Sequence, residues 1–408
     1  MNRLFTLVFL LASLLVSCEE EPTNPQEFIS QRVIINPYEG IDFKTVSRVK
    51  AISHEHIFRA SQVKYAYDRG IRYFACVNYF PACPTYPLSG WSYEYEDYVS
   101  PKDLTLTKIT YSGSIPSFVD KNGEIIYTDD LVQLPNAEHA FYANTSGMHF
   151  NVLGSLFGEC TNGHRNSLEW SEEALGMKKG QWYNMHPKWS IEDINPQFLN
   201  EDSQLFKGKV FGTINHTSNE KAVRLLLEKC PDVFKAIEIV NQGSTESECS
   251  KFRDLWDKLL RENKRIWGTS VIDWQVEGPD GKQRLGACNV LLIQDYEGQS
   301  NLKKSEMGLD AYLAGCYIPA GLADNDIVDF KVTNTSARLE VTGNPSQIMV
   351  VTNRGKKEFD NTSVVEYTYG LKDSYVRFEI WYRDEEFNLQ DYLFTNPIFI
   401  EYKEEIRE

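Results

Sequence analysis

The sequence predicts an α/β barrel over residues 46–319, followed by a small antiparallel β-sandwich over residues 322–403. Short apolar strands alternate with helical stretches as far as Pro319, and repeated βα units of this length suit a TIM-like barrel. After Ala320 the helical pattern stops, and short β-branched and aromatic runs follow one another between turns. We therefore expect an active site at the C-terminal ends of the barrel strands.

The first residues of the chain resemble an export signal. Arg3 precedes an apolar run, Leu4–Val16, that is too short to span a membrane as a stable helix. The run ends in Leu-Val-Ser-Cys, which resembles a bacterial lipobox, so we expect residues 1–17 to be removed and Cys18 to carry lipid. A soluble-secretion signal with an incidental cysteine is the alternative. Residues 18–45 would then be a tether and lead-in that holds the protein in the cell envelope, on the periplasmic side of the outer membrane or at the cell surface.

Helical and strand periodicity defines the elements of the barrel region. Asn219 is a candidate N-cap before apolar residues at helical spacing, and Gly70 stops a helix before a strand begins. The clearest elements are helices over Ser61–Arg69, Asn219–Lys229 and Glu248–Asn263, and strands over Ile71–Val77, Phe234–Val240 and Arg265–Ile272. Residues 81–113 and 158–201 are rich in aromatic residues and proline, which predicts long loops over the strand ends.

Six short strands are expected after Ala320. They are Ile327–Val332, Arg338–Val341, Gln347–Thr352, Val364–Tyr369, Tyr375–Tyr382 and Ile398–Tyr402. Asn-Pro, Asn-Arg-Gly and Lys-Asp turns separate them, and this spacing favours a small sandwich. We expect the sandwich to supply no ligand to a metal.

Charge and cysteine content restrict the possible functions. The formal net charge of −16 argues against nucleic-acid binding through general electrostatics, and a phosphorylated substrate would need local positive charge or a metal. The eight cysteines lack CxxC spacing, so a disulfide framework is not expected. Pairing of Cys76 with Cys83, or of Cys230 with Cys249, stays open for an oxidising envelope.

The most informative motif is Ser53-His54-Glu55-His56, which follows the largely apolar stretch Val49–Ile52. Two histidines at this spacing on a strand present their imidazoles on the same side, because strand side chains alternate. Such a pair is the usual start of a transition-metal site. The whole chain contains only 7 His, so a pair at this spacing is not expected from composition. Two solvated histidines on an edge strand are the alternative.

Further candidate ligands follow or flank apolar strands, as ligands at a barrel mouth should. They are Glu138, His139, His149, His216 and Asp273. A lone histidine beside a strand is more often a hydrogen-bonded core residue, so the order and context of the whole set carry the interpretation.

Together these motifs resemble the PHP (polymerase and histidinol phosphatase) superfamily, which are metal-dependent phosphoesterases on a distorted (β/α)7 barrel. The likeness covers about residues 36–319. In the first half of this region, Asn36–Phe43 resembles the segment before the family's H-x-H motif, and Gly70–Ala75 resembles the strand before its Asp-His motif. Next, Ile214-Asn215-His216 resembles its Asn-His-Pro motif, and Ala236–Asn241 resembles its Glu-x-x-Asn motif. Asp273 falls at its last acidic motif, and Leu313–Tyr317 resembles the end of its barrel. The predicted sandwich, through Tyr375–Ile380 and Thr395–Ile398, resembles a module appended to exported members.

The resemblance implies a two-metal site. A first ion would take His54, His56, Glu138 and Asp273, and a second would share Glu138 and add His149 and His216. The positions of the family's third-site ligands hold Gln62, Tyr79 and Gln275, with Asn78 in place of an aspartate. The resemblance thus implies at most two ions of Zn, Mn or Fe. The Asn78-Tyr79 pair leaves a reduced or altered activity open.

Other roles are assigned more loosely. Glu138, as the bridging carboxylate, and His139, as a partner that supports this carboxylate or as a proton shuttle, are the candidate catalytic residues. An ordinary loop histidine is the alternative for His139. The candidate lining of the substrate pocket consists of Asn78, Tyr79, Glu238, Asn241 and Gln275.

The leading hypothesis is a lipid-anchored, divalent-metal-dependent hydrolase of the phosphoesterase type. Its substrate would be a small phosphorylated or sugar-containing molecule, and its membrane contact would come from the lipid anchor. The main alternative is a catalytically altered or inactive barrel lipoprotein that binds a glycan or another ligand. Metal-dependent hydrolysis of a non-phosphate bond is a third possibility.

Overall fold

The computed structural model describes residues 29–55, 66–75, 91–92, 106–112, 115–120, 125–127, 131–134, 136, 138–141, 148–155, 201, 204–273 and 286–405. The chain divides into two compact units, residues 1–33 with 401–408 and residues 34–400. In the first unit the described residues belong to β1 (Ile29–Ile35) and β23 (Ile398–Glu405), where the Arg32 guanidinium lies 5.6 Å from the ring centre of Tyr402. The second unit contains every candidate site residue that the structure describes.

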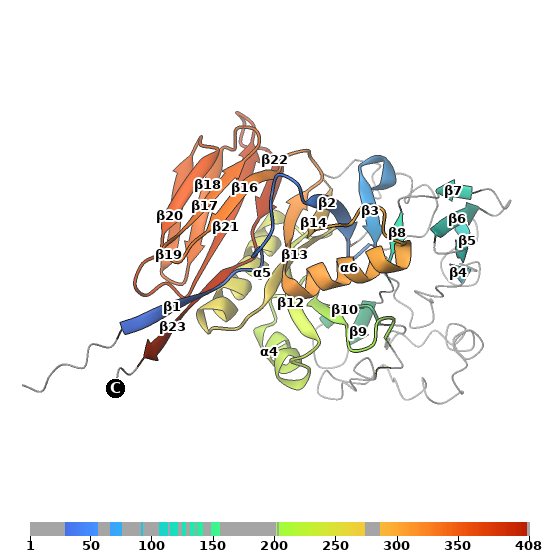
Figure 1. Ribbon diagram of the computed structural model, residues 1–408, viewed down its shortest axis with the longest axis horizontal. Coiled ribbons are helices and arrows are strands. Elements are labelled where there is room, and N and C mark those ends of the chain that lie inside the picture. The colour runs from blue at the N-terminus through green and yellow to red at the C-terminus, as the bar shows by residue number, and fades with distance from the viewer. Residues whose placement is uncertain are drawn as a thin grey trace, which may run out of the picture. The chain divides into compact units, whose positions relative to one another are not determined.

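A large mixed sheet runs through the second unit (Figure 1). Its strands lie in the order β21, β22, β15, β14, β2, β3 and β8, and β18 pairs with both β21 and β19. Their bounds are β2 (Ser47–Ile52), β3 (Ile71–Phe74), β8 (Val132–Gln133), β14 (Ala287–Ile293), β15 (Tyr317–Gly321), β18 (Gln347–Thr352), β19 (Gly355–Asp360), β21 (Tyr375–Arg383) and β22 (Leu389–Phe394). Strands β2, β3 and β8 are parallel, whereas β14 is antiparallel to both β2 and β15.

A five-stranded sheet carries most of the candidate site. Its order is β13 (Trp267–Val271), β12 (Phe234–Asn241), β11 (Phe211–Ile214), β10 (Met148–Leu153) and β9 (Glu138–Phe141). Strands β11, β12 and β13 run parallel, and β10 runs antiparallel to both of its neighbours. Two smaller sheets contain β16 (Ile327–Val332), β17 (Ser336–Val341) and β20 (Val364–Thr368), and β4 (Trp91–Ser92), β5 (Leu106–Ser112), β6 (Ile115–Asp120) and β7 (Ile125–Tyr127).

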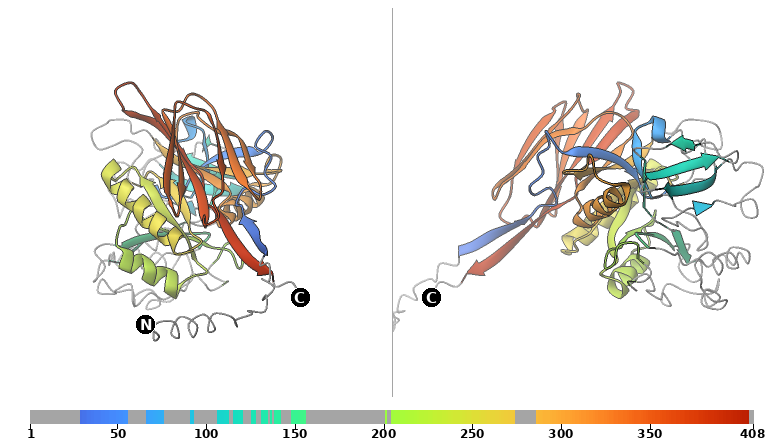
Figure 2. Two further views of the ribbon diagram at one scale, coloured as in Figure 1. Left: turned by 90° about the vertical axis from the view of Figure 1, so that its left-hand side faces the viewer. Right: turned by 45° about the vertical axis from the view of Figure 1, so that its right-hand side comes forward.

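Strands β11 and β12 each lead into a helix whose start is encoded locally. The Asn219 side chain caps α4 (Glu220–Lys229), as expected, and Thr245 with Glu248 forms a capping box at the start of α5 (Glu246–Arg261). The two helices lie side by side, joined by an ion pair of 2.6 Å between Lys258 and Glu220 (Figure 2). No helix within the described ranges is long and apolar enough to cross a membrane.

The prediction of a distorted (β/α)7 barrel is wrong. In the described part of the chain, α-helix is confined to α4, α5, α6 (Asn301–Ala314) and residues 66–68, and strand predominates. The described strands form separate sheets instead of one closed cylinder, because β9 and β13 end the five-stranded sheet and β8 ends the large one. Apolar periodicity predicts where strands occur but not the direction in which they pair. Strands β9, β10 and β14 pair antiparallel, which a simple βα repeat does not produce.

The strands of the expected sandwich do not all form sheets separate from the predicted barrel region. Strand β22 pairs with β15, so the large sheet continues from the predicted barrel region into the C-terminal strands. The sequence predicted six strands here but missed β19 and β22. Residues 355–360 read Gly-Lys-Lys-Glu-Phe-Asp and contain one apolar side chain, so β19 has no apolar alternation to reveal it.

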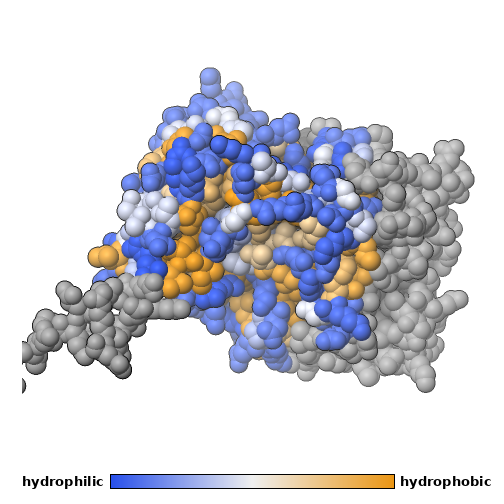
Figure 3. All heavy atoms as spheres, viewed as in Figure 1, coloured by the Kyte–Doolittle hydropathy of each residue, from blue (hydrophilic) through white to orange (hydrophobic). Residues whose placement is uncertain are grey.

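The apolar core joins the five-stranded sheet to the C-terminal strands. One cluster of buried side chains contains Phe150 of β10, Trp256 of α5 and Phe394 of β22. A second cluster contains Tyr73 of β3 and Tyr312 of α6. The face drawn in Figure 3 is largely hydrophilic over the described residues, with apolar side chains between the polar ones.

The described cysteines are buried and form no disulfide. They are Cys230, Cys249, Cys288 and Cys316. The pair Cys230–Cys249 that the sequence left open therefore does not form, while Cys76 and Cys83 lie outside the described residues.

Candidate metal centre

Three neighbouring strands bring Glu138, His149 and His216 together. Glu138 begins β9 opposite Asn151 of β10, and His149 lies two residues earlier on β10, on the same face, because strand side chains alternate. His216 follows β11, and the preceding Asn215 donates its backbone N–H to the carbonyl of His149 at 3.0 Å. This bond extends the pairing of β10 with β11 and carries His216 to the other two residues.

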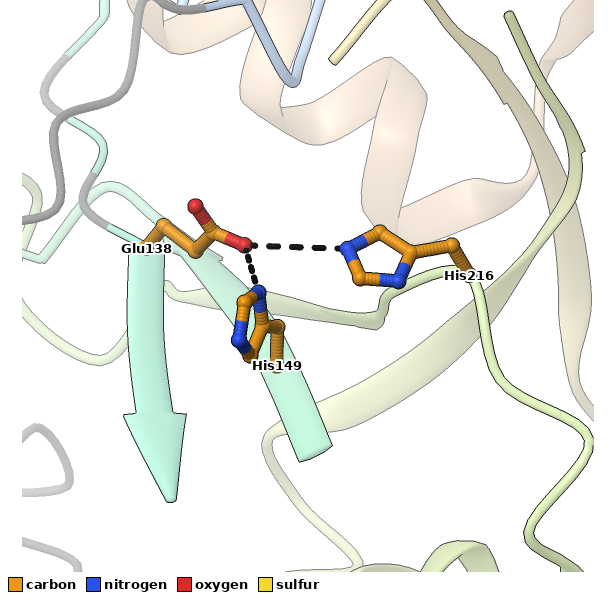
Figure 4. A group of neighbouring side chains, drawn as sticks. All are labelled: Glu138, His149 and His216. Carbon is orange, nitrogen blue, oxygen red and sulfur yellow. Dashed lines mark hydrogen bonds and ion pairs between the residues drawn. The ribbon is translucent and has the colours of Figure 1, made fainter. Parts of the chain in front are cut away.

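The Glu138 carboxylate is the centre of this group (Figure 4). Its Oε1 lies 2.7 Å from Nδ1 of His149 and 3.9 Å from Nε2 of His216. The three candidate ligand atoms all lie within 4.8 Å of one another, and Glu138 is buried. Tetrahedral ligands about 2.1 Å from one ion lie roughly 3.4 Å apart, so small adjustments would fit this group to a transition metal.

His54 and Asp273 reach the same group from the ends of β2 and β13. The Asp273 backbone N–H donates to the His54 carbonyl at 2.8 Å, and Glu55 forms an isolated parallel bridge with Asp273. The φ angle of Asp273 is 65°, a left-handed backbone conformation that is uncommon outside glycine and is found often at functional sites. The Nε2 atom of His54 lies 3.2 Å from Oδ1 of Asp273 and 3.5 Å from Oε1 of Glu138.

Glu238 and Asn241 hold these groups in place. Glu238 Oε1 lies 2.6 Å from Nδ1 of His54, and Oε2 accepts hydrogen bonds from the His216 backbone N–H at 2.7 Å and from Nδ2 of Asn241 at 3.0 Å. Nδ2 of Asn241 also lies 3.0 Å from Oδ2 of Asp273. With Nδ1 of His54 bonded to Glu238, Nε2 faces the other carboxylates and is the nitrogen that can take either a proton or a metal ion, an arrangement common to metal-binding histidines. The sequence assigned Glu238 and Asn241 to a substrate pocket, but the structure shows both in contact with the candidate ligands.

The charges at the centre shift one another's ionisation. Burial alone would lower the pKa of His54, but the carboxylates of Asp273, Glu238 and Glu138 outweigh it and hold this pKa well above its ordinary value. Burial would raise the pKa of Glu138, but His54 and the hydrogen bonds from the neighbouring histidines hold this pKa well below its ordinary value. Protons and a metal ion would therefore compete for the same imidazole nitrogens.

A set of buried side-chain amides supports the metal centre, and no sequence pattern predicts this role for them. The Nδ2 atoms of Asn136 and Asn151 donate to the Ser53 carbonyl at 2.7 and 3.0 Å, which fixes the backbone just before His54. Asn215 in turn donates to Oδ1 of Asn151 at 3.1 Å. Isolated asparagines form no motif, and only the closeness of Asn136 to Glu138 in the chain could have pointed to the first of them.

Several sequence-predicted residues lie outside the described residues. They are Cys18, His56, Gln62, Asn78, Tyr79 and Gln275. His139 lies on β9, but its side chain is likewise not among those that the structure describes. Lipidation and the substituted third metal site therefore stay predictions.

Comparison with known proteins assigns neither a family nor a function to the chain. No protein-family model and no curated protein matches the chain. Among solved structures, a protein from Bifidobacterium adolescentis that is provisionally described as a metal-dependent phosphoesterase is 10% identical. The likeness covers 57% of this chain and 90% of that one, with a TM-score of 0.25. A likeness this distant establishes neither a shared fold nor a function. The described geometry establishes a candidate three-residue metal site, Glu138, His149 and His216, for an ion of unknown identity.

Proposed function

We propose that this chain is a divalent-metal-dependent hydrolase of the phosphoesterase type. The observation that supports the proposal is the convergence of a buried carboxylate, Glu138, with the imidazoles of His54, His149 and His216 and with Asp273. Imidazole nitrogens and carboxylate oxygens gathered at one point are the donor set that Zn, Mn and Fe prefer in proteins.

Following the family resemblance, we assign these donors to two groups that share Glu138. One contains His54 and Asp273, whose nearest donor atoms are 3.2 Å apart, and the other contains His149 and His216. The two groups adjoin, because Nε2 of His216 also lies 3.6 Å from Oδ2 of Asp273. In our proposal each group would hold one ion, with His56 added to the first and Glu138 between the two. When bound, divalent ions in such a centre supply Lewis acidity at a phosphoryl group and activate water near neutral pH.

The chain's own residues would prepare the site for this chemistry. Glu238 fixes the ring of His54 through Nδ1, and Asn241 holds Glu238 and Asp273 at a set distance. Such supporting contacts orient ligands and raise their basicity. We propose His139, next to Glu138 in the chain, as the group that carries a proton to or from the substrate.

Elemental analysis of the purified protein, combined with hydrolysis of p-nitrophenyl phosphate and bis-p-nitrophenyl phosphate, tests this proposal. We expect bound divalent metal and turnover of one of the two esters, loss of both after chelation, and recovery on adding Zn, Mn or Fe. Metal with turnover of non-phosphate esters alone would reject the phosphoesterase assignment. Protein with no metal and no turnover would reject the enzyme and favour the ligand-binding alternative.

We also propose that lipid on Cys18 anchors the protein in the cell envelope, on the strength of the Leu15-Val16-Ser17-Cys18 motif. Cys18→Ser should move the protein from the membrane fraction to the soluble fraction, and mass spectrometry should show lipid on the unsubstituted protein only. Unchanged fractionation of the variant with membranes would contradict the anchor.

A further inference from the structure

A cavity of about 510 Å³ lies in the second unit, next to the metal centre. Residues at the end of β12, on α5 and on the β21–β22 hairpin line it, among them Asn241, Gln242, Arg253, Trp381, Arg383 and Phe387. This volume is within the range of sites that enclose small organic molecules, about 300–1,000 Å³. Asn241 also contacts two carboxylates of the metal centre, but the other five residues make none of the contacts described for that centre.

Arg253 brings a positive charge into the cavity wall. It is half-buried, and one of its N–H groups donates to the Ile239 carbonyl at 3.3 Å. No carboxylate forms an ion pair with it within the ranges that the structure describes, but its charge reaches Glu379 and helps to lower the pKa of that carboxyl group. Its guanidinium lies 5.3 Å from the ring centre of Trp381. This is a cation–π contact, and the N–H groups of Arg253 that do not bond to Ile239 are able to bind an anion.

The second arginine is already neutralised, and it orders the mouth of the cavity. Arg383 pairs with Glu246 at 2.7 Å and donates to the Phe387 carbonyl at 3.1 Å, while its guanidinium lies 5.4 Å from the ring centre of Trp381. The Phe387 backbone N–H donates to the Asp384 carbonyl at 3.0 Å. The loop between β21 and β22 is thus held by several hydrogen bonds.

This ordered loop nevertheless exposes a large apolar ring. Phe387 is 80% exposed and has a φ angle of 65°, a strained conformation for an aromatic residue. Phe387 also lines the cavity, which places an exposed aromatic residue at the wall of the proposed site. An exposed aromatic ring beside a cavity is typical of sites that stack on a flat or apolar ring of a ligand.

We propose that this cavity binds a small organic anion that carries a ring, either a sugar or an aromatic ring bearing a phosphate or carboxylate group. Arg253 binds the anionic group through the N–H groups that do not bond to Ile239, and Phe387 covers the ring. The net charge of −16 repels anions from most of the surface, so binding an anion requires a local positive site of this kind. The inference does not depend on the proposed hydrolase activity, because it uses contacts outside the metal centre.

Ligand-observed NMR with chelator-treated full-length protein tests the chemistry of the ligand. The probes are phenyl phosphate, benzoate, glucose 6-phosphate and glucuronate, with benzyl alcohol, glucose and inorganic phosphate as matched compounds that lack either the charge or the ring. We expect at least one ring-bearing anion to bind about ten-fold more tightly than its neutral counterpart and than phosphate, because charge and ring each contribute. Comparison of the phosphate and carboxylate probes identifies the anionic group. Binding of no anion, or equal binding of neutral and anionic probes, would overturn the proposal.

Variants then locate the binding site. Arg253→Gln should weaken binding of the anionic probe about ten-fold, and Phe387→Ala, at an exposed position that should not affect folding, should weaken every ring-bearing probe. Arg338→Gln is the matched control, because Arg338 pairs with Asp329 and Glu340 on another sheet. Unchanged affinity in Arg253→Gln and Phe387→Ala would overturn the proposal. Glu138→Ala should bind the probes normally even if it loses all metal. Loss of probe binding would therefore count against the proposed cavity ligand, whereas loss of metal or turnover would concern only the proposed hydrolase.

Discussion

Within the described ranges, two clusters of buried charged side chains differ in the partners that their carboxylates have. In the first, Arg377 pairs with Asp257 and with Glu379, each at 2.6 Å, and its guanidinium lies 4.4 Å from the ring centre of Trp256. In the metal centre, the contacts described for Glu138 are instead with imidazoles and an amide. A guanidinium stays charged at every pH that a folded protein meets, whereas the charge of an imidazole depends on its protonation.

The difference separates a structural cluster from a candidate functional one. Arg377 is a permanent cation that pairs with one carboxylate of α5 and one of β21, and in the folded protein it neither releases a proton nor binds a metal ion. The metal centre places a carboxylate among groups that can give up a proton and accept a metal ion at the same atom. Burial of charge therefore says little about function by itself, and the identity of the neutralising partner says more.

The largest expected effect comes from removing the carboxylate that both metal groups share. Glu138→Ala should lose nearly all bound metal, and its hydrolytic rate should fall by about 10³-fold or more because the catalytic centre acts as a unit. Elemental analysis and a phosphoester assay measure the two quantities. Tyr79→Phe is the control and should keep the metal content of the unsubstituted protein. Retention of metal by Glu138→Ala, or more than two tightly held ions in the unsubstituted protein, would contradict the assignment.

Breaking the Arg377 cluster should affect stability instead of metal content. Asp257→Ala leaves Arg377 buried with one carboxylate fewer, which should reduce the free energy of unfolding by about 3–5 kcal/mol. Urea denaturation measures this loss, and the metal bound per folded molecule should not change. Asp254→Ala, at an exposed position of the same helix, should cost less than about 0.5 kcal/mol. Equal stability of the two variants would show that the pairing of Arg377 with Asp257 does not stabilise the fold.

A smaller effect is expected from the residue that orients His54. Glu238→Gln should weaken metal binding by about 10–100-fold, because the ring of His54 loses the carboxylate that fixes its tautomer. Competition with a chelator of known affinity measures the change, and excess metal should restore turnover. Glu262→Gln, at an exposed position next to α5, should bind metal normally. Unchanged metal affinity in Glu238→Gln would show that Glu238 does not support metal binding.

The smallest effect concerns pH. Burial would raise the pKa of Glu379, but the charges of Arg377, Arg253 and Lys356 together outweigh burial, and the net pKa lies below the ordinary value of 4.5. A lowered folded-state pKa contributes stability that is fully present above about pH 4.5 and is lost as the pH falls through the folded-state value. The stability difference between the unsubstituted protein and Glu379→Gln should therefore shrink in acid. A difference that stays constant between about pH 7 and 3 would contradict this assignment.

The sequence could predict local features of the molecule because these depend on neighbouring residues. The cap at Asn219, the strand that begins at Phe234 and the candidate ligands at the ends of apolar runs all follow from short-range patterns. The convergence of His54, Glu138 and Asp273 could be anticipated only through the family resemblance, and their role as metal ligands remains a prediction.

Long-range pairing was beyond the sequence patterns. Nothing in residues 287–293 distinguishes a parallel from an antiparallel strand, yet β14 pairs antiparallel on both sides. Strand β22 was missed, although its pairing with β15 carries the large sheet into the C-terminal region. Asn136 and Asn151 also escaped notice, since an amide that donates to a backbone carbonyl needs only one correctly placed neighbour, and that neighbour is set by the fold.

The bond between the Asp273 backbone N–H and the His54 carbonyl has a further consequence, for the mechanical integrity of the fold. At this point two sheets meet through one backbone hydrogen bond and one isolated bridge. An ion held by side chains of both sheets would join stretches of chain that are far apart in sequence, and it would stabilise the folded state because the site exists only while these stretches are held together. A chelator would then loosen the protein as well as inhibit it, and the amide hydrogen of Asp273 would exchange with solvent faster once the metal is removed.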